Sequence, residues 1–319
     1  MNQHARKSYL AILILAGISV ILSGTAYANI EDTIEKSFTV KPGGTLNVDT
    51  KRGSIEVEGH RGNTVEVQVI REVKTSDKED ARKILEKFQV EFDQRGDDVT
   101  ITATYDEKNI LKKVLNDINK KLRVKFVISV PDEYNVDLHT SGGSIGVRGL
   151  EGMVKSRTSG GSLAFDGITG DIEGRTSGGS IKVGNVEGSA DIHTSGGSIT
   201  IEKAFGEVDA HTSGGSITVH EVMGTIQADT SGGSIKAYIS RQPESSCRLT
   251  TSGGSVTVYM ADDVSVDVNA RTSGGRVNTE FPVTVQGEIK RSNLEAKING
   301  GGPELYLRTS GGSIHLKKK

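Results

Sequence analysis

The sequence predicts an all-β protein, a parallel β-solenoid built from coils of 18 residues. Three observations indicate this fold. The segment Thr-Ser-Gly-Gly occurs nine times, it recurs mostly at a spacing of 18 residues, and apolar residues flank each copy at alternate positions. A period this short is typical of a solenoid, in which each coil is stabilised by the coils stacked on it. The nine threonines are Thr140, Thr158, Thr176, Thr194, Thr212, Thr230, Thr251, Thr272 and Thr309.

Each coil is expected to contain two short strands that bury one face, because apolar residues alternate with others on both sides of every Thr-Ser-Gly-Gly segment. The inward positions lie four and two residues before the threonine and five and seven residues after it. Ser156 and Gly174 are the exceptions to this pattern. The position five residues after the threonine is always aliphatic: Ile145, Leu163, Ile181, Ile199, Ile217, Ile235, Val256, Val277 and Ile314.

Glycines are expected to make the turns between the strands. The Gly-Gly pair would bend the chain by adopting positive φ, which costs glycine nothing sterically. The threonine is expected to point inward at this turn, with its hydroxyl bonded to the backbone of the neighbouring coil. A second set of bends falls half a coil later, near Gly152, Gly170, Gly188, Gly206 and Gly224.

Two other solenoids with an 18-residue period do not fit the sequence. A three-sided hexapeptide helix needs an aliphatic residue eleven positions after the threonine, where the chain has Glu151, Thr169 and Glu187. A calcium-binding nonapeptide roll needs an aspartate soon after the glycines, where the chain has Gly146 and Ala164. Right-handed winding is expected, since parallel crossover connections are nearly always right-handed.

Residues 1–28 have the features of a secretory signal peptide. Two basic residues precede an apolar run over 9–22, and an A-x-A pattern precedes the expected cleavage between Ala28 and Asn29. A retained membrane anchor is the alternative, although the run is short for a membrane span. The mature protein is therefore expected to be exported to the periplasm, the cell surface or the medium, without a stable membrane span.

The composition excludes some partners. The formal net charge is -2 in 319 residues, so no nucleic-acid partner and no polybasic membrane contact are expected. The single cysteine, Cys247, falls at an inward position, where it is expected to act as a small core residue. One cysteine cannot form a disulfide within the chain.

The chain divides into four expected regions. After the signal peptide, N-terminal strands and a degenerate first coil occupy 29–61, where the chain reads Thr-Lys-Arg-Gly-Ser in place of Thr-Ser-Gly-Gly-Ser. An α+β insertion or cap follows over 62–130, and the solenoid repeats occupy 131–319. The insertion is expected to cover an open edge of the solenoid against end-to-end aggregation, with docking of a partner as the alternative.

Inside the insertion the sequence predicts two helices and a hairpin. Ser76 and Glu79 form a capping box before an apolar pattern, which predicts a helix over 77–88. Alternating residues on either side of 95–98 predict a hairpin. A second amphipathic pattern predicts a helix over 108–122.

Near the C-terminus the repeat becomes irregular. One long coil is expected over 272–309, with its turn at 299–303. The lysines at 317–319 place charge on what the sequence predicts to be the last strand, where charge discourages the addition of another strand.

The most distinctive outward position is the one directly before each threonine. It is basic or histidine in five successive coils, and stacking would place these side chains about 4.8 Å apart in a stripe. This stripe is the candidate binding site for an anionic glycan or an envelope protein, and a solvated, salt-bridged face is the alternative interpretation. The stripe consists of His139, Arg157, Arg175, His193 and His211.

Two further groups of outward side chains could carry chemistry. Asp191 and Asp209 flank two histidines of the stripe, and these residue types bind transition metals. Nothing in the sequence encloses them, so no metal and no cofactor is expected. Tyr238 and Tyr259 lie at equivalent places on neighbouring coils and are expected to pack as a pair, with a small sugar platform as the alternative.

The sequence shows no convincing catalytic set. The serines recur as turn residues and do not lie in a Gly-x-Ser-x-Gly elbow. No two carboxylates stand out as an acid and a base, and no glycine-rich turn opens a helix after a strand as phosphate loops do. The chain is therefore not expected to be an enzyme.

These features together resemble a bacterial putative-adhesin family of unknown function with β-strand repeats. The resemblance rests on the signal peptide, the degenerate first coil, the mixed insertion, the repeated Thr-Ser-Gly-Gly-Ser-Ile coils and the late segments 298–303 and 307–310. It spans nearly all of the mature chain and implies an exported β-solenoid with a role in surface binding. It implies no particular ligand and no binding or catalytic residues.

The expected function is therefore that of a non-enzymatic exported binding or scaffold protein, adhesin-like, which presents a repetitive β-solenoid surface to a glycan or protein partner. Two alternatives stay open. Extended parallel solenoids commonly host polysaccharide lyases or hydrolases. The chain could also be a periplasmic envelope-stress or assembly partner that docks through the insertion.

Overall fold

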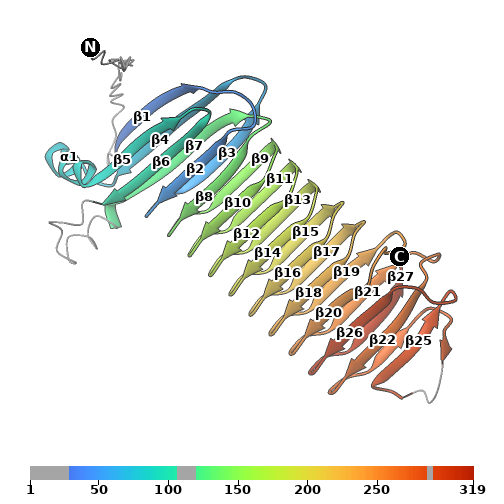
Figure 1. The fold of residues 1–319 in the computed structure, drawn as a ribbon. Coiled ribbons are helices and arrows are strands. Elements are labelled where there is room, and N and C mark those ends of the chain that lie inside the picture. The colour runs from blue at the N-terminus through green and yellow to red at the C-terminus, as the bar shows by residue number, and fades with distance from the viewer. Residues whose placement is uncertain (1–28, 106–119, 286–289) are drawn as a thin grey trace, which may run out of the picture.

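The computed structural model describes residues 29–105, 120–285 and 290–319. These residues form an elongated all-β solenoid in which coils stack along one axis (Figure 1). Two long sheets make the two sides of the stack, with 13 and 14 strands among the described residues. One hydrophobic core fills the space between the sheets. The predicted fold class is confirmed.

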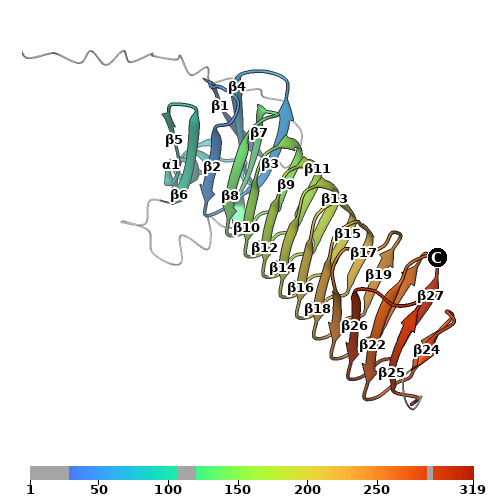
Figure 2. The same cartoon turned by 45° about the vertical axis from the view of Figure 1, so that its right-hand side comes forward.

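Each coil of the central stack contributes one strand to each sheet (Figures 1 and 2). The strand before the Thr-Ser-Gly-Gly segment lies in one sheet, named here the upstream sheet, and the strand after it lies in the downstream sheet. Neighbouring strands are parallel and pair equivalent residues, as in Thr158 opposite Thr176. The upstream strands are β8 (Asn135–Thr140), β10 (Val154–Thr158), β12 (Ile172–Thr176), β14 (Ala190–Thr194), β16 (Val208–Thr212), β18 (Ile226–Thr230) and β20 (Cys247–Thr251). The downstream strands are β9 (Ile145–Glu151), β11 (Leu163–Thr169), β13 (Ile181–Glu187), β15 (Ile199–Ala204), β17 (Ile217–Val222), β19 (Ile235–Ile239) and β21 (Val256–Met260).

The inward positions are those predicted from the alternation. Ile145, Ile181 and Ile217 are at most 1% exposed, and Cys247 is buried in the same core. Most downstream strands also bury a third residue that the alternating pattern did not predict. The alternation is interrupted before this residue, where two successive residues, such as Arg148 and Gly149, face outward. These third residues are Leu150, Ile168, Val186, Ala204 and Val222.

Two small residues break the inward pattern beside one large side chain. Phe165 is 2% exposed, and a Cβ atom added at Gly174 would lie 3.0 Å from its ring. Ser156 lies opposite Gly174 in the upstream sheet and is also buried, and its hydroxyl has no hydrogen-bond partner in the described part of the chain. The aromatic ring occupies volume that larger residues fill in other coils.

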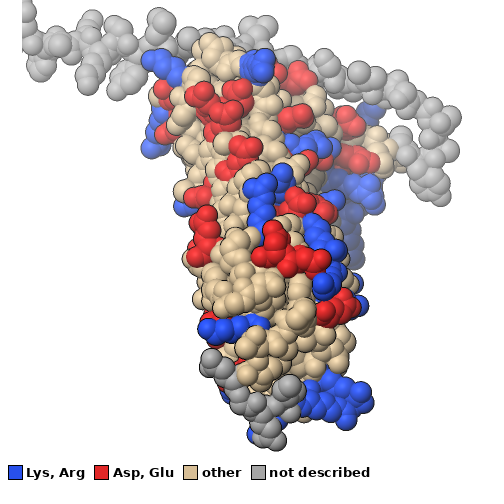
Figure 3. Space-filling view, turned by 90° about the vertical axis from the view of Figure 1, so that its right-hand side faces the viewer, with Lys and Arg blue, Asp and Glu red and all other residues tan. Residues whose placement is uncertain are grey.

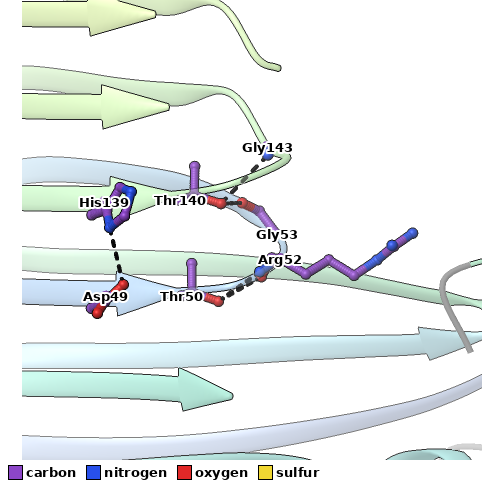
Figure 4. Close-up of polar contacts among 7 residues, drawn as sticks. All are labelled: Asp49, Thr50, Arg52, Gly53, His139, Thr140 and Gly143. Carbon is purple, nitrogen blue, oxygen red and sulfur yellow. Dashed lines mark hydrogen bonds and ion pairs between the residues drawn. The ribbon is translucent and has the colours of Figure 1, made fainter. Parts of the chain in front are cut away.

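The repeated threonine forms a hydrogen-bond ladder along one corner of the stack. Thr158 donates its hydroxyl to the carbonyl of Gly143 in the adjacent coil, at 2.8 Å. The same oxygen accepts the backbone N–H of Gly161 in its own coil, at 3.3 Å. Figure 4 shows the first step of the ladder, from Thr140 to Gly53. The predicted bond between the threonine and the neighbouring backbone is confirmed.

The prediction that the Gly-Gly pair turns through positive φ is wrong. Glycines in the left-handed region lie elsewhere, for example Gly149 at a φ of 64°. The second glycine of the pair is required because stacked corners approach closely: a Cβ atom at Gly161 would lie 2.0 Å from the carbonyl oxygen of Gly143. The first glycine is less confined, since a Cβ atom at Gly160 would meet no atom nearer than 3.9 Å.

At the N-terminal end, residues from the predicted insertion extend both sheets. In the upstream sheet, β6 (Asp98–Tyr105) pairs in parallel with β2 (Thr45–Thr50) of the first coil. In the downstream sheet, β7 (Leu122–Pro131) pairs in parallel with β3 (Ser54–His60). The insertion therefore lies at the end of the stack and continues its core.

Antiparallel strands then close both sheets at this end (Figure 1). β5 (Phe88–Arg95) is the edge strand beside β6, and the predicted hairpin at 95–98 joins the two. β4 (Thr64–Val73) pairs with β7, and β1 (Ile30–Thr39) pairs with β4 as the edge strand of the downstream sheet.

The first predicted helix of the insertion is confirmed as α1 (Lys78–Lys87). Its N-cap is Asp77, whose carboxylate accepts two backbone N–H groups of the first turn. The predicted capping box that begins at Ser76 is therefore wrong. The second predicted helix, over 108–122, lies mostly outside the described residues.

At the C-terminal end the coils are not stacked in the order of the sequence. The last coil of the chain, β26 (Glu304–Thr309) and β27 (Ile314–Lys318), lies between two earlier coils. On one side it pairs with β20 and β21. On the other side it pairs with β22 (Val266–Thr272) and β23 (Val277–Thr279).

This arrangement corrects two expectations. The single long coil predicted over 272–309 is wrong. β25 (Asn293–Ile298) pairs antiparallel with β22, and β24 (Thr284–Val285) pairs antiparallel with β25 and ends the upstream sheet. The expectation that the last strand of the chain is the edge is wrong over 314–316, where β27 is paired on both sides and the short strand β23 is the edge, whereas Lys317 and Lys318 extend past β23 and pair with β21 alone. The turn predicted at 299–303 joins β25 to β26.

Candidate functional site

Three hollows lie along the corner formed by the Thr-Ser-Gly-Gly segments of the described residues. The middle hollow has a volume of about 470 Å³ and is lined by four residues of the predicted stripe, by buried threonines and by serines. The stripe residues are Arg157, Arg175, His193 and His211, and the serines are Ser159, Ser177, Ser195 and Ser213.

The register of the upstream strands places the predicted stripe in one row. His139 lies opposite Arg157, and Arg157 lies opposite Arg175. The row continues through His193 to His211. His139 does not line the middle hollow, and its Nδ1 atom lies 3.1 Å from a carboxylate oxygen in the adjacent coil (Figure 4). The structure therefore brings four of the five predicted residues together.

Acidic neighbours neutralise part of the stripe, so it is less basic than its sequence suggests. Arg175 pairs with Glu173 at 2.9 Å and with Asp191 at 2.8 Å. The hydrogen bond from Arg175 lowers the pKa of Glu173. Burial, followed by the charge of Arg175, lowers the pKa of His193 and so favours its neutral form. Arg157 is the exposed cation of this hollow.

The hollow at the N-terminal end of the same corner is also lined by cations. It has a volume of about 700 Å³ and is lined by Lys51, Arg52, Arg123 and Lys125 together with Glu72, which pairs with Arg123 at 3.9 Å. The Nε atom of Arg52 donates to the carbonyl of Leu122 at 2.8 Å, and the side chain extends away from the turn in Figure 4. The stripe prediction missed this group, although the Lys-Arg dipeptide in the degenerate first coil was its signal.

The third hollow lies in the interleaved C-terminal coils. It has a volume of about 340 Å³ and contains Arg271 and Arg308. Ten strands of the upstream sheet run in order from β2 to β22, so at about 4.8 Å per strand the three hollows are spread over about 40 Å. Basic side chains thus line each of these hollows, whereas between the second and the third hollow the stripe positions hold Asp229 and Thr250.

Aspartate and histidine side chains gather on β14 and β16, as the sequence predicts. One ligand atom from each of Asp191, His193 and Asp209 lies within 4.8 Å of the other two. The rings of His193 and His211 are 5.7 Å apart, edge to face. Arg175 contacts both Asp191 and His193.

The outer face of the downstream sheet carries a groove that the sequence analysis does not predict. Its volume is about 670 Å³, and side chains of both charge signs line it. Gly146, Ala164 and Lys182 occupy the same position on three successive strands and line the groove. The two small outward residues in successive coils are the signal in the sequence that could have predicted this groove. The other charged residues around it include Glu56, Glu58, Arg148 and Asp166.

The predicted tyrosine pair is present and is part of a longer stack. The rings of Tyr238 and Tyr259 are 4.6 Å apart and nearly parallel, and His220 stacks on the other face of Tyr238 at 5.0 Å. The ammonium group of Lys317 lies 5.9 Å from the Tyr259 ring. Ring–ring packing and a cation therefore occupy the faces that a sugar platform would need.

The surface as a whole is mixed in charge. On the side shown in Figure 3, basic and acidic side chains are interspersed, in keeping with the small net charge. Within the described ranges, no helix is both long enough and apolar enough to cross a membrane.

A family model described as Toastrack DUF4097 matches residues 45–317, whereas no curated protein matches the chain. Among solved structures, a "putative adhesin" from Bacteroides fragilis is 14% identical, with a TM-score of 0.42 over 89% of this chain and 96% of that one. A "putative cell adhesion protein" from Clostridium sporogenes is 15% identical, with a TM-score of 0.22 over 89% and 99%. A "putative lipid binding protein" from Parabacteroides distasonis is 13% identical, with a TM-score of 0.40 over 89% and 96%. At these identities no ligand is transferred to the chain.

Proposed function

The chain belongs to the Toastrack DUF4097 family, and from this premise and the corner hollows we propose that it is an exported, non-enzymatic, adhesin-like binding protein of the cell envelope. Its proposed ligand is a linear anionic glycan that lies along the Thr-Ser-Gly-Gly corner. The observation that supports this proposal is the alignment of three hollows with basic linings along one corner.

Binding would depend on many weak contacts. Arginine offers a planar fork of N–H donors that suits carboxylate or sulfate groups. Arg157 and Arg308 are exposed on this corner, and Arg271 is exposed but pairs with Glu295. Because the coils form one stack, contacts at successive hollows add up for a ligand long enough to reach them. Affinity should therefore rise with ligand length until the ligand spans about 40 Å, the length of the corner. It should fall as added salt screens the charges.

The test is retention of the purified protein on an immobilised carboxylated glycan such as polygalacturonate. Replacing Arg157, Arg175, His193 and His211 together by glutamine should abolish retention while the circular dichroism spectrum stays the same. A matched control replaces four outward residues of the downstream sheet by glutamine: Lys182, Lys203, His220 and Lys236. Undiminished retention of the first variant, or equal losses in both variants, would reject the corner as the site.

The same assay separates binding from catalysis. If the chain only binds, the polymer recovered after long incubation keeps its length. Shortened polymer would show the lyase or hydrolase activity that remains the alternative for a parallel solenoid, and the proposal of a non-enzymatic protein would then fail.

Export is proposed from residues 1–28, which lie outside the described residues. We expect fractionation of the producing cell to place the protein in the periplasm, on the surface or in the medium, with Asn29 as its first residue. Recovery of a protein that retains residues 1–28 in the membrane fraction would contradict cleavage after Ala28.

A further inference from the structure

The same Asp-x-His pattern occurs on two strands that stack directly on each other. Asp191 and His193 lie on β14, and Asp209 and His211 lie on β16, with aspartate opposite aspartate and histidine opposite histidine. The residue between each pair is buried in the core, so all four polar side chains project from the outer face of the upstream sheet. From this placement we infer that the four residues form a binding site for a divalent transition-metal ion such as Zn²⁺.

The distances are close to those that one ion requires. Ligand atoms of Asp191, His193 and Asp209 lie within 4.8 Å of one another. In a tetrahedral zinc site with bonds of about 2.1 Å, ligand atoms are about 3.4 Å apart. The side chains must therefore close by up to about 1.4 Å, which rotation about side-chain bonds on an outer face can supply. His211 lies outside this group of three, with its ring 5.7 Å from that of His193, and its side chain must also turn toward the ion to serve as the fourth ligand.

One carboxylate oxygen in this group lacks a partner. Oδ1 of Asp191 is shielded from solvent and has no hydrogen-bond donor within the described ranges, and it lies 3.5 Å from Nδ1 of His193. A shielded carboxylate oxygen without a donor is energetically costly. A cation shared by Asp191 and His193 would satisfy this atom.

The ligand types select the class of metal. Imidazole nitrogen together with carboxylate oxygen suits zinc, copper or nickel, whereas calcium and magnesium prefer oxygen alone. Neutral imidazole is the form that binds a metal.

The charged groups around the site act in opposite directions. Asp229 on β18 lies opposite His211 and adds negative charge beside the site. Arg175 on β12 occupies part of the site, since it donates to Asp191 and contacts Nδ1 of His193. An incoming metal ion must displace this guanidinium group, which keeps its second partner, Glu173, at 2.9 Å. Arg175 is therefore a competing cation, and removing it should tighten metal binding.

Isothermal titration of the purified protein with Zn²⁺, after treatment with a chelator, tests this inference without any glycan, so its outcome is independent of the proposed function. We expect one Zn²⁺ per chain. Single replacements His193→Gln and Asp209→Asn should each weaken binding by about tenfold or more. Arg175→Gln should strengthen it, and urea denaturation in the absence of metal would check that all variants remain folded.

The chain contains a matched control. Asp137 and His139 form the same Asp-x-His pattern on β8, but the equivalent positions of the next strand hold Lys155 and Arg157, so no second aspartate–histidine pair lies on that side. His139→Gln should therefore leave zinc affinity unchanged. The inference would be overturned by the absence of saturable binding up to about 1 mM, an affinity of only about 4 kcal/mol. It would also be overturned if zinc binding survived both His193→Gln and Asp209→Asn, or if Arg175→Gln weakened it.

Discussion

Replacing Gly161 by alanine should disrupt the stack, whereas replacing its neighbour Gly160 should not. A Cβ atom at Gly161 would lie 2.0 Å from the carbonyl oxygen of Gly143 and 2.3 Å from its carbonyl carbon. Cβ atoms essentially never approach other heavy atoms below 3.0 Å, so the two coils would have to separate locally by about 1 Å from a spacing of about 4.8 Å. That separation would lengthen the hydrogen bond from the Thr158 hydroxyl to the Gly143 carbonyl and the backbone hydrogen bonds between the neighbouring strands.

The expected cost at Gly161 is about 4 kcal/mol or more, the range reached by severe steric defects and broken hydrogen-bond networks. At Gly160, a Cβ atom would make only ordinary contact at 3.9 Å, and the backbone is outside the left-handed region. Alanine there should be neutral or stabilising by about 0.4–1 kcal/mol, because it restricts the unfolded chain.

Urea denaturation followed by circular dichroism measures both free energies of unfolding. The adjacent pair Gly178 and Gly179 offers a repeat of the comparison, since Cβ atoms there would meet neighbours at 3.5 Å and 2.0 Å respectively. Equal losses for Gly160→Ala and Gly161→Ala, or a larger loss at Gly160, would refute the argument from coil spacing.

Two further predictions concern the polar side chains of Ser156 and His193. Ser156→Ala should raise the free energy of unfolding by about 1 kcal/mol, because it removes a buried hydroxyl without a partner in the described part of the chain; a clear loss of stability in a denaturation curve would count against this. Burial and the charge of Arg175 lower the pKa of His193 from its ordinary 6.5, so below that pH the unfolded chain binds a proton that the folded chain does not. The free energy of unfolding should therefore fall as the pH drops from about 7 to about 5, and His193→Gln should flatten this slope in urea midpoints measured across the range. A variant with the slope of the wild type would rule out His193 as its source.

The core could be predicted from the sequence because its signal is local and repeated. The alternation around each threonine identifies buried residues such as Ile181 and Ile217 without knowledge of the neighbouring coil. The purpose of the Gly-Gly pair could not be found in this way. Gly160 and Gly161 look equivalent in the sequence, but only the second approaches another backbone closely, and that approach exists only after the coils have stacked.

The candidate site was predicted in part for a similar reason. The column of Arg157, Arg175, His193 and His211 follows from the period, so the sequence places these side chains in one row. Their charge state does not follow from the period, because one of the two carboxylates that pair with Arg175, that of Asp191, comes from the next coil. The metal-ligand group depends on the same contacts between coils.

The order of the C-terminal coils could not be predicted from the repeat, because any two stacked coils form the same threonine–carbonyl hydrogen bond at the corner. Thr309 donates to Gly254 and Thr272 donates to Gly312, both at 2.6 Å, and these bonds would look alike in either order. The difference lies outside the repeat, in β25, which pairs antiparallel with β22. Once β25 covers that side of β22, no parallel coil can be added there.

The coil that carries β25 must therefore be outermost, and the last coil of the chain must lie inside it. The N-terminal end obeys the same rule, since β5 and β1 pair antiparallel with their neighbours and form the edges of the two sheets. At the C-terminal end the edge strands β24 and β23 have two and three residues within the described ranges. Short or antiparallel edges offer a poor template for another parallel coil. In the upstream sheet, elements outside the Thr-Ser-Gly-Gly repeat thus decide where the stack stops, and we expect the edges at both ends to keep identical coils from joining end to end with those of another chain.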